Sequence, residues 1–177
     1  VNPTVYAIER RGMDEADHIM CVSELTRRTV IEKYGQPPHK VSTVHNAVEP
    51  WANPDEFIKH DRKYKLVTFL GRITMQKGPE YFVEAAARVL AKTDGVRFVM
   101  AGSGDMMNKM IDLVAQRGIA DKFHFPGFMR GRQVQEVLAD SDVYIMPSVS
   151  EPFGISPLEA MQVGCPSIIS HQSGCAE

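Results

Sequence analysis

Short apolar runs alternate with amphipathic stretches from the middle of the chain onward. The runs predict strands buried on both faces, because they are apolar throughout and do not alternate with polar positions. We expect such strands over 66–70, 96–101, 123–125, 143–146 and 166–169. Helical periodicity predicts helices between them, over 79–92, 105–117, 131–139 and 157–163. This alternation predicts an α/β fold with a doubly wound, Rossmann-like parallel sheet.

The first fifty residues are less regular. The pattern predicts a helix over 5–16, a strand over 18–22, a helix from the N-cap Ser23 to Tyr34, and a strand over 41–45. Gly35 would end the second helix. The segment 49–64 is polar and contains prolines, which is typical of a linker. We therefore expect three parts, comprising residues 1–48, the linker 49–64 and residues 65–177.

The segment from Glu151 to Glu159 follows the predicted strand 143–146. It therefore lies at the carboxyl end of a strand, where open α/β sheets bind ligands. Ser156, Pro157 and Glu159 have the spacing of a capping box, with Ser156 at N-cap and Glu159 at N3. The free N–H groups of such a first turn are suited to binding phosphate. The pattern fits equally well a Glu159 that only caps its helix and a Glu151 that is a solvated loop carboxylate.

A second segment, Gly71-Arg-Ile-Thr-Met-Gln-Lys-Gly78, also follows a strand and precedes a helix. It brings Arg72 and Lys77 to one strand end beside a helix N-terminus. This favours a diphosphate site, since Arg binds phosphate bidentately and Lys acts as a point charge. The alternative is a pair of exposed surface cations.

A third turn, Gly102-Ser103-Gly104-Asp105, follows the strand 96–101. A dinucleotide fingerprint is not completed, because Met107 stands where the third glycine is required. We expect this loop to line the crevice, with structural turn chemistry as the alternative.

Composition and charge exclude several classes of function. The net charge of −2 gives no reason to expect a nucleic-acid partner. No apolar stretch approaches the ~20 residues of a membrane span. Three cysteines without a CxxC pair favour a reducing compartment, and we expect a cytoplasmic location. No histidine or cysteine cluster indicates a metal site. Asp140 and Asp142 precede their strand, so we expect solvated or capping roles at the amino end of the sheet.

Together these segments resemble the glycosyltransferases of the GT-B fold that retain anomeric configuration. That group includes glycogen and starch synthases, sucrose synthases and many mannosyltransferases. The resemblance rests on four motifs in order, namely 18–26, 40–49, Gly71-Arg72 with Lys77-Gly78, and the two glutamates Glu151 and Glu159. It implies that residues 1–48 end an acceptor-binding domain with its interdomain hinge. Residues 65–177 would then form an incomplete nucleotide-sugar-binding domain.

The resemblance also implies roles for individual residues. Arg72 and Lys77, beside Gly71, would grip the donor diphosphate, while Glu151 would meet the donor sugar. Glu159 would bind the ribose hydroxyls. The remaining donor contacts would come from the backbone around Phe153, Gly154 and Ile155, from the loop at Gly102 and Ser103, and from Met129 with its neighbours near the base. Glu151-Pro-Phe-Gly154 looks more like the glucan synthases than the mannosyltransferases, which implies glucose.

The implied reaction transfers a hexose from a nucleoside diphosphate sugar to an acceptor hydroxyl with no metal or other cofactor. The acceptor, a glycan or another hydroxyl compound, would bind through an N-terminal domain, so we expect the 177-residue chain alone to have little transferase activity. Where the family's glycine-rich turn usually carries a second glycine and a proline, this chain has Ser173-Gly174-Cys175, which leaves a donor contact at Glu177 open.

Two other functions fit the same motifs. A module that binds nucleotide sugars without chemistry would need the same residues, and a sugar-nucleotide epimerase shares the fold. The combination of Arg72 and Lys77 with Glu151 and Glu159 matches transferases better than epimerases. A phosphorylase would require a pyridoxal-phosphate lysine, for which the sequence gives no indication.

Overall fold

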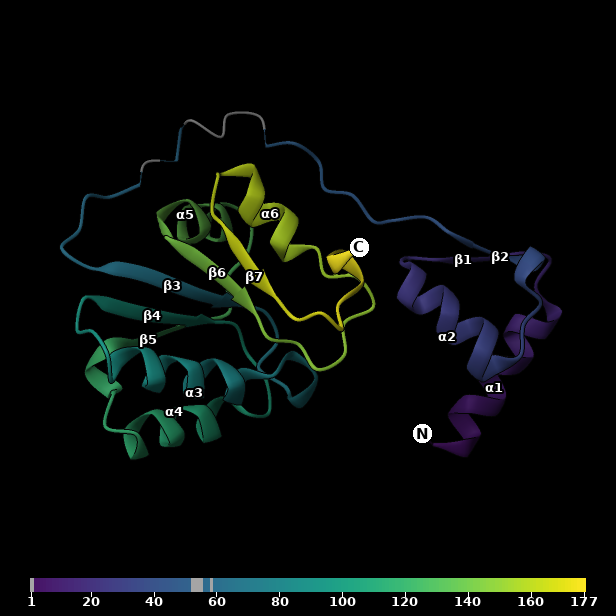
Figure 1. The fold of residues 1–177 in the computed structure, drawn as a ribbon, viewed down its shortest axis with the longest axis horizontal. Coiled ribbons are helices and arrows are strands. Elements are labelled where there is room, and N and C mark those ends of the chain that lie inside the picture. The colour runs from purple at the N-terminus through teal and green to yellow at the C-terminus, as the bar shows by residue number, and fades with distance from the viewer. Residues whose placement is uncertain (1, 52–55, 58) are drawn as a thin grey trace.

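The computed structural model describes residues 2–51, 56–57 and 59–177, which form two units (Figure 1). The first unit contains α1 (Pro3–Glu15), β1 (Ile19–Cys21), α2 (Glu24–Tyr34) and β2 (Val41–Thr43). β1 and β2 pair in parallel. Cys21, Val30 and Val41 form their small core. As predicted, Ser23 caps α2, and Gly35 ends it in the left-handed conformation.

The second unit is built on five parallel strands in the order β5-β4-β3-β6-β7. They are β3 (Lys65–Leu70), β4 (Val96–Ala101), β5 (Phe123–Gly127), β6 (Val143–Met146) and β7 (Ser167–Ile169). Counted within this unit the order is 3-2-1-4-5, which is that of the first five strands of a Rossmann sheet. The predicted doubly wound parallel fold is therefore confirmed.

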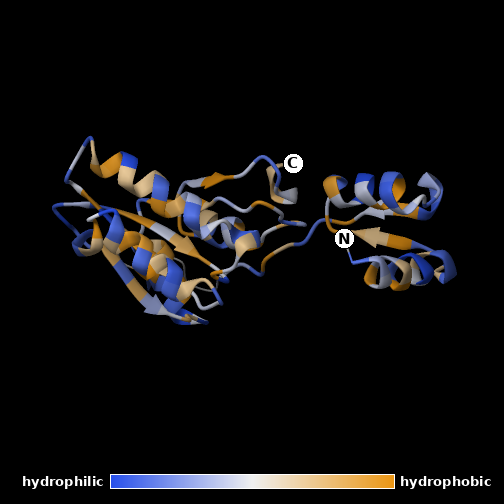
Figure 2. Ribbon diagram, turned by 90° about the horizontal axis from the view of Figure 1, so that it is seen from below, coloured by the Kyte–Doolittle hydropathy of each residue, from blue (hydrophilic) through white to orange (hydrophobic). Residues whose placement is uncertain are grey.

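Helices cover both faces of the sheet. α3 (Pro79–Leu90) and α4 (Met107–Gln116) contact each other, as do α5 (Arg132–Asp140) and α6 (Ser156–Gln162), and the two pairs lie on opposite faces (Figure 1). Figure 2 shows hydrophobic residues on several strands and both hydrophobic and hydrophilic residues on the helices. The central strands β3 and β4 are largely buried on both sides, as predicted, whereas β7, at the end of the strand order, leaves Ile168 59% exposed.

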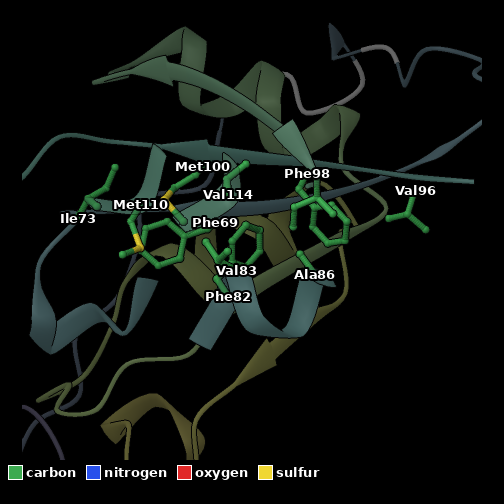
Figure 3. Close-up of a cluster of buried hydrophobic side chains, with 11 residues drawn as sticks. Phe69, Ile73, Phe82, Val83, Ala86, Val96, Phe98, Met100, Met110 and Val114 are labelled. Carbon is green, nitrogen blue, oxygen red and sulfur yellow. The ribbon is translucent and has the colours of Figure 1, made fainter. Parts of the chain in front are cut away.

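The larger core lies between the sheet and the α3–α4 face. Figure 3 shows Phe69, Phe82 and Phe98 packed there with Met100 and Met110. The rings of Phe82 and Phe98 meet edge to face at 5.8 Å, a favoured aromatic geometry. A second core, around Leu138, Tyr144 and Ala160, lies under α5 and α6. The two cores pack against opposite faces of the sheet, and the strands position the loops at its carboxyl edge.

The predicted elements are present with bounds shifted by a few residues. The predicted helix 105–117 begins only at Met107, because Asp105 and Met106 form a turn. The predicted strand 123–125 continues to Gly127. The proposed division at 49–64 stays a prediction, and residues 52–55 and 58 of that segment lie outside the described residues. None of the described helices is long and apolar enough to cross a membrane.

Candidate functional site

The candidate site lies where β3 and β6 run side by side at the centre of the sheet. From this point the chain after β3 enters α3 on one face, and the chain after β6 enters α6 on the other. The two loops touch, since Val149 N–H donates to Gln76 O at 2.8 Å. A Cβ on Gly78 would lie 2.2 Å from Pro147 O, so only glycine fits there. Such a switch point in strand order is where open α/β sheets form ligand crevices.

A cavity of about 470 Å³ opens between these loops. Lys77 comes from the loop after β3 and Glu151 from the loop after β6, and their side chains form an ion pair. Glu151 is 8% exposed. It is therefore not the solvated loop carboxylate that the sequence also allowed. The wall also includes the turn from Phe153 to Ser156, Val22 of the first unit and Asn46 of the segment after β2.

A second cavity, of about 250 Å³, adjoins the first. Its lining is mostly apolar and contains one carboxylate, Glu159. The other lining residues are Leu70, Gly71, Arg72, Ala101, Gly102, Ser103, Phe128, Met129 and Val134. Burial raises the pKa of Glu159 above its ordinary value, and a hydrogen bond with the Ser156 side chain opposes this in part. The cavity thus offers mostly apolar walls together with one carboxylate.

Arg72 lines both cavities and so stands at their junction. Its side chain is exposed, and no carboxylate in the described part of the chain pairs with it. The loop after β4 packs tightly beside it, since a Cβ on Gly102 would lie 1.8 Å from Gly71 O. The close approach of these two backbones brings Ser103 to the smaller cavity and requires a glycine directly after β4.

The predicted capping box at Ser156 is wrong. α6 begins at Ser156 itself, Ile155 occupies the N-cap position, and no side chain caps the helix. Gly154, at φ +97°, turns the chain early enough for Ile155 to be helical already. Glu159 is consequently the fourth helical residue, and it lines the smaller cavity instead of capping. Among the described residues, the N–H groups of Gly154, Ile155 and Ser156 have no intramolecular acceptor.

The structure thus brings together every residue that the sequence singled out for the site. Arg72, Lys77, Glu151 and Phe153–Ile155 line the larger cavity, while Gly102, Ser103, Met129 and Glu159 line the smaller one. Sequence reasoning missed Asn46, Ser148 and Val134. Asn46 lies in the segment 40–49, which we had assigned only to the hinge. Glu177, left open by the sequence, lines neither cavity and instead contacts the start of α2.

Asp140 and Asp142 lie at the amino end of the sheet, far along the strands from these cavities. The sequence predicts solvated or capping roles for them, but both carboxylates are held by ion pairs. Asp140 binds Arg62, while Asp142 accepts from Leu66 N–H at 2.8 Å and pairs with Lys59 at 2.9 Å. These two carboxylates therefore fix the start of β3.

Comparisons with known proteins agree with this geometry. The sequence model described as "Glycosyl transferases group 1" matches residues 53–177, and that described as "Glycosyltransferase Family 4" matches residues 1–51. An uncharacterised glycosyltransferase of Methanocaldococcus jannaschii is 34% identical over 98% of the chain. The 2-deoxystreptamine glucosyltransferase of Streptomyces kanamyceticus is 31% identical over 93% of it. The chain spans 47% and 45% of these two relatives, somewhat under half of their length.

Solved structures share the fold. HepE of Anabaena, crystallised with UDP and glucose, superposes with a TM-score of 0.84 over 99% of this chain and 50% of its own, at 17% identity. Sucrose-phosphate synthase of Thermosynechococcus elongatus superposes with the same TM-score over 98% of this chain and 45% of its own, at 20% identity. Because the group 1 sequence model covers well over half of the chain, including both cavities' main loops, the chain belongs to the glycosyl transferases group 1 family.

Proposed function

We propose that this chain is the donor-binding part of a retaining glycosyltransferase, which transfers a hexose from a nucleoside diphosphate sugar to an acceptor hydroxyl. One observation carries the proposal, namely that two cavities of different chemistry meet at Arg72. A nucleoside diphosphate sugar has the same order of parts, with an apolar base and ribose at one end, a sugar at the other and two phosphates between them.

In this proposal the smaller cavity takes the nucleoside. Base and ribose would lie against the apolar walls near Met129, and Glu159 would accept hydrogen bonds from the ribose hydroxyls. Arg72 would bind the diphosphate at the junction. The larger cavity would take the sugar, with Glu151 and the unpaired N–H groups of Gly154 and Ile155 facing its hydroxyls and the adjacent phosphate.

The charges in the larger cavity suit cleavage of the bond between the anomeric carbon and the phosphate oxygen. Negative charge then develops on the leaving diphosphate, where Arg72 and Lys77 supply fixed positive charge. Positive charge develops on the sugar ring, and the Glu151 carboxylate stabilises this charge. The acceptor hydroxyl attacks on the leaving-group face and passes its proton to a phosphate oxygen. These side chains supply the charge stabilisation, so we propose a reaction without a metal.

Glucose is the proposed sugar. The sequence Glu151-Pro-Phe-Gly154 resembles glucan synthases. A named relative is a glucosyltransferase, and the HepE complex contains UDP and glucose. UDP is accordingly the first nucleotide to test, followed by ADP and GDP. The free thiols of Cys21 and Cys165 are buried, which suits the reducing cytoplasmic location that we propose.

Calorimetric titration of the chain with UDP, ADP and GDP tests this proposal. We expect one of them to bind, and the double variant Arg72→Ala, Lys77→Ala to lose at least about 1.5 kcal/mol of binding free energy, as expected for charged hydrogen bonds. The matched control is Lys109→Ala, Arg117→Ala, which removes one Lys and one Arg from exposed ion pairs elsewhere. Equal losses of binding free energy in both double variants would show that the effect comes from overall charge and not from a site at Arg72 and Lys77. Absence of binding by all three nucleotides would refute the donor site.

A further inference from the structure

The segment from Ser173 to Glu177 lies between α2 and the loop that carries Glu151. Gly174 N–H donates to Glu151 O at 3.0 Å, and Cys175 N–H donates to Phe153 O at 2.9 Å. Glu151 and Ser173 form an isolated parallel bridge. The backbone of the Glu151–Phe153 loop is thus held along one side by this segment.

The other side of the segment is held by α2. Glu177 accepts hydrogen bonds from the N–H groups of Glu24 and Leu25, both at 2.7 Å. Thr26 N–H is satisfied by Ser23 Oγ at 3.1 Å. A carboxylate on the first helical N–H groups is favourable, because these donors otherwise lack partners and the helix dipole is positive there. Burial raises the pKa of Glu177, but the two backbone hydrogen bonds and the contact with His45 outweigh it and lower the pKa.

Two further contacts close the arrangement. Ser23, fully buried, donates from Oγ to Pro152 O at 2.6 Å, one residue beyond Glu151. His45 Nε2 lies 3.1 Å from the Glu177 carboxylate, and its ring packs against Phe153 at 5.8 Å between centroids. Phe153 in turn lines the larger cavity.

No space remains at the centre of this arrangement. A Cβ on Gly174 would lie 2.1 Å from Pro152 O and 2.6 Å from Ser23 Cβ. The three segments therefore meet in direct van der Waals contact, and a displacement of one moves the others. The contacts reach the loop backbone rather than the sheet, so they fix the loop and not the fold of the second unit.

We propose that Glu177 and Ser23 act as positioning residues for the donor sugar, by holding the Glu151–Phe153 loop against α2. The inference rests on the proposed function of the larger cavity. Neither residue faces the diphosphate, since Arg72 lies on the loop after β3 and the nucleoside cavity is built from other segments. Loss of the contact should therefore weaken recognition of the sugar more than recognition of the nucleotide, which is held mainly by Arg72 and the smaller cavity.

The test compares the wild-type chain with Glu177→Ala and Glu177→Gln. We expect Glu177→Ala to bind UDP-glucose about tenfold more weakly while its affinity for UDP stays within about twofold. Glu177→Gln keeps one carbonyl oxygen for a helix N–H, so its loss should be intermediate. The matched control is Asn2→Ala, which removes the cap of α1, where Asn2 accepts from Thr4 N–H at 3.0 Å in the same unit. This control should change neither affinity.

Hydrogen exchange at the amides of Gly174 and Cys175 gives a readout that does not depend on nucleotide binding. We expect faster exchange there in Glu177→Ala than in the wild type or Asn2→Ala. Unchanged exchange at these amides would overturn the inference, even for a chain that binds no nucleotide. An equal loss of UDP and UDP-glucose affinity would also overturn it, because a merely structural role affects both. If the wild-type chain binds no nucleotide but exchange is faster in the variant, the proposed donor site is refuted. The role of Glu177 in holding the Glu151–Phe153 loop is then still supported.

Discussion

Lys77 and Glu151 form an ion pair across the larger cavity, although 74 residues separate them in the sequence. Each residue belongs to a different loop at the switch point between β3 and β6. The cation proposed for the diphosphate is thus held by the carboxylate proposed for the sugar. With Lys77 23% exposed and Glu151 nearly buried, a bound donor would have to share or replace this contact.

Removing the Glu151 charge should separate binding of the nucleotide from binding of the sugar. In Glu151→Gln we expect UDP affinity to be kept or increased, because Lys77 is free to bind phosphate. Affinity for UDP-glucose should fall about tenfold, corresponding to about 1.4 kcal/mol. Calorimetry with both ligands measures the two effects. A parallel loss of both ligands would contradict the role assigned to Glu151.

Glu159 should determine how much the ribose hydroxyls contribute to the binding free energy of UDP. The wild-type chain is expected to bind UDP about tenfold better than 2′,3′-dideoxy-UDP, and Glu159→Ala should reduce this ratio to near one, because the only carboxylate lining the smaller cavity is gone. Since burial raises the pKa of Glu159, the preference should weaken on acidification at a higher pH than for an ordinary glutamate. A ratio unaffected by the substitution would place the ribose elsewhere.

Gly102 should tolerate no side chain. Gly102→Ala places a Cβ 1.8 Å from Gly71 O at φ +145°, so we expect a loss of about 3 kcal/mol in the free energy of unfolding from the overlap and strained backbone. Gly118→Ala is the control, because Gly118 also has a positive φ, of +68°, but its Cβ would enter open space. That variant should lose only about 1 kcal/mol. Urea denaturation of both variants measures the difference, and similar values would contradict the packing argument.

Asp142 should make stability depend on pH below neutrality. Burial acts to raise its pKa, but the N–H of Leu66 and the charges of Lys59 and Lys65 outweigh it and lower the pKa from 3.8 to about 2. A lowered pKa means stability that is present above about pH 4 and is lost as the pH falls toward 2. Asp142→Asn should therefore lose about 2 kcal/mol at neutral pH, and the difference from the wild type should vanish near pH 2.

The control for this pH dependence is Asp121→Asn, since the Asp121 side chain is 70% exposed and pairs with its neighbour Lys122. Its stability should follow the wild type at every pH. Denaturation midpoints between pH 2 and 7 give the comparison. A constant gap between Asp142→Asn and the wild type over that range would show that packing, and not ionisation, is responsible.

The fold class, and the strand ends that carry the polar motifs, could be predicted from the sequence alone. Apolar runs such as 143–146 are typical of strands in a parallel sheet, and the polar motifs follow these runs directly, so each motif lies at a carboxyl end. The cap at Ser23 and the stop at Gly35 were equally readable, because a helix end depends on a few adjacent residues.

Which of these strand ends meet became clear from the packing of the folded chain. Strand order places β6 beside β3, which brings Lys77 to Glu151, while the loop after β4 lines the smaller cavity beside Arg72. The predicted N-cap of α6 is wrong because the turn at Gly154, rather than the Ser156 side chain, begins the helix. The contact of Glu177 with α2 spans 153 residues. Periodicity and capping signals involve residues that are close in the sequence. Contacts such as that of Glu177 with α2 depend on how distant segments pack, which the local sequence pattern does not indicate.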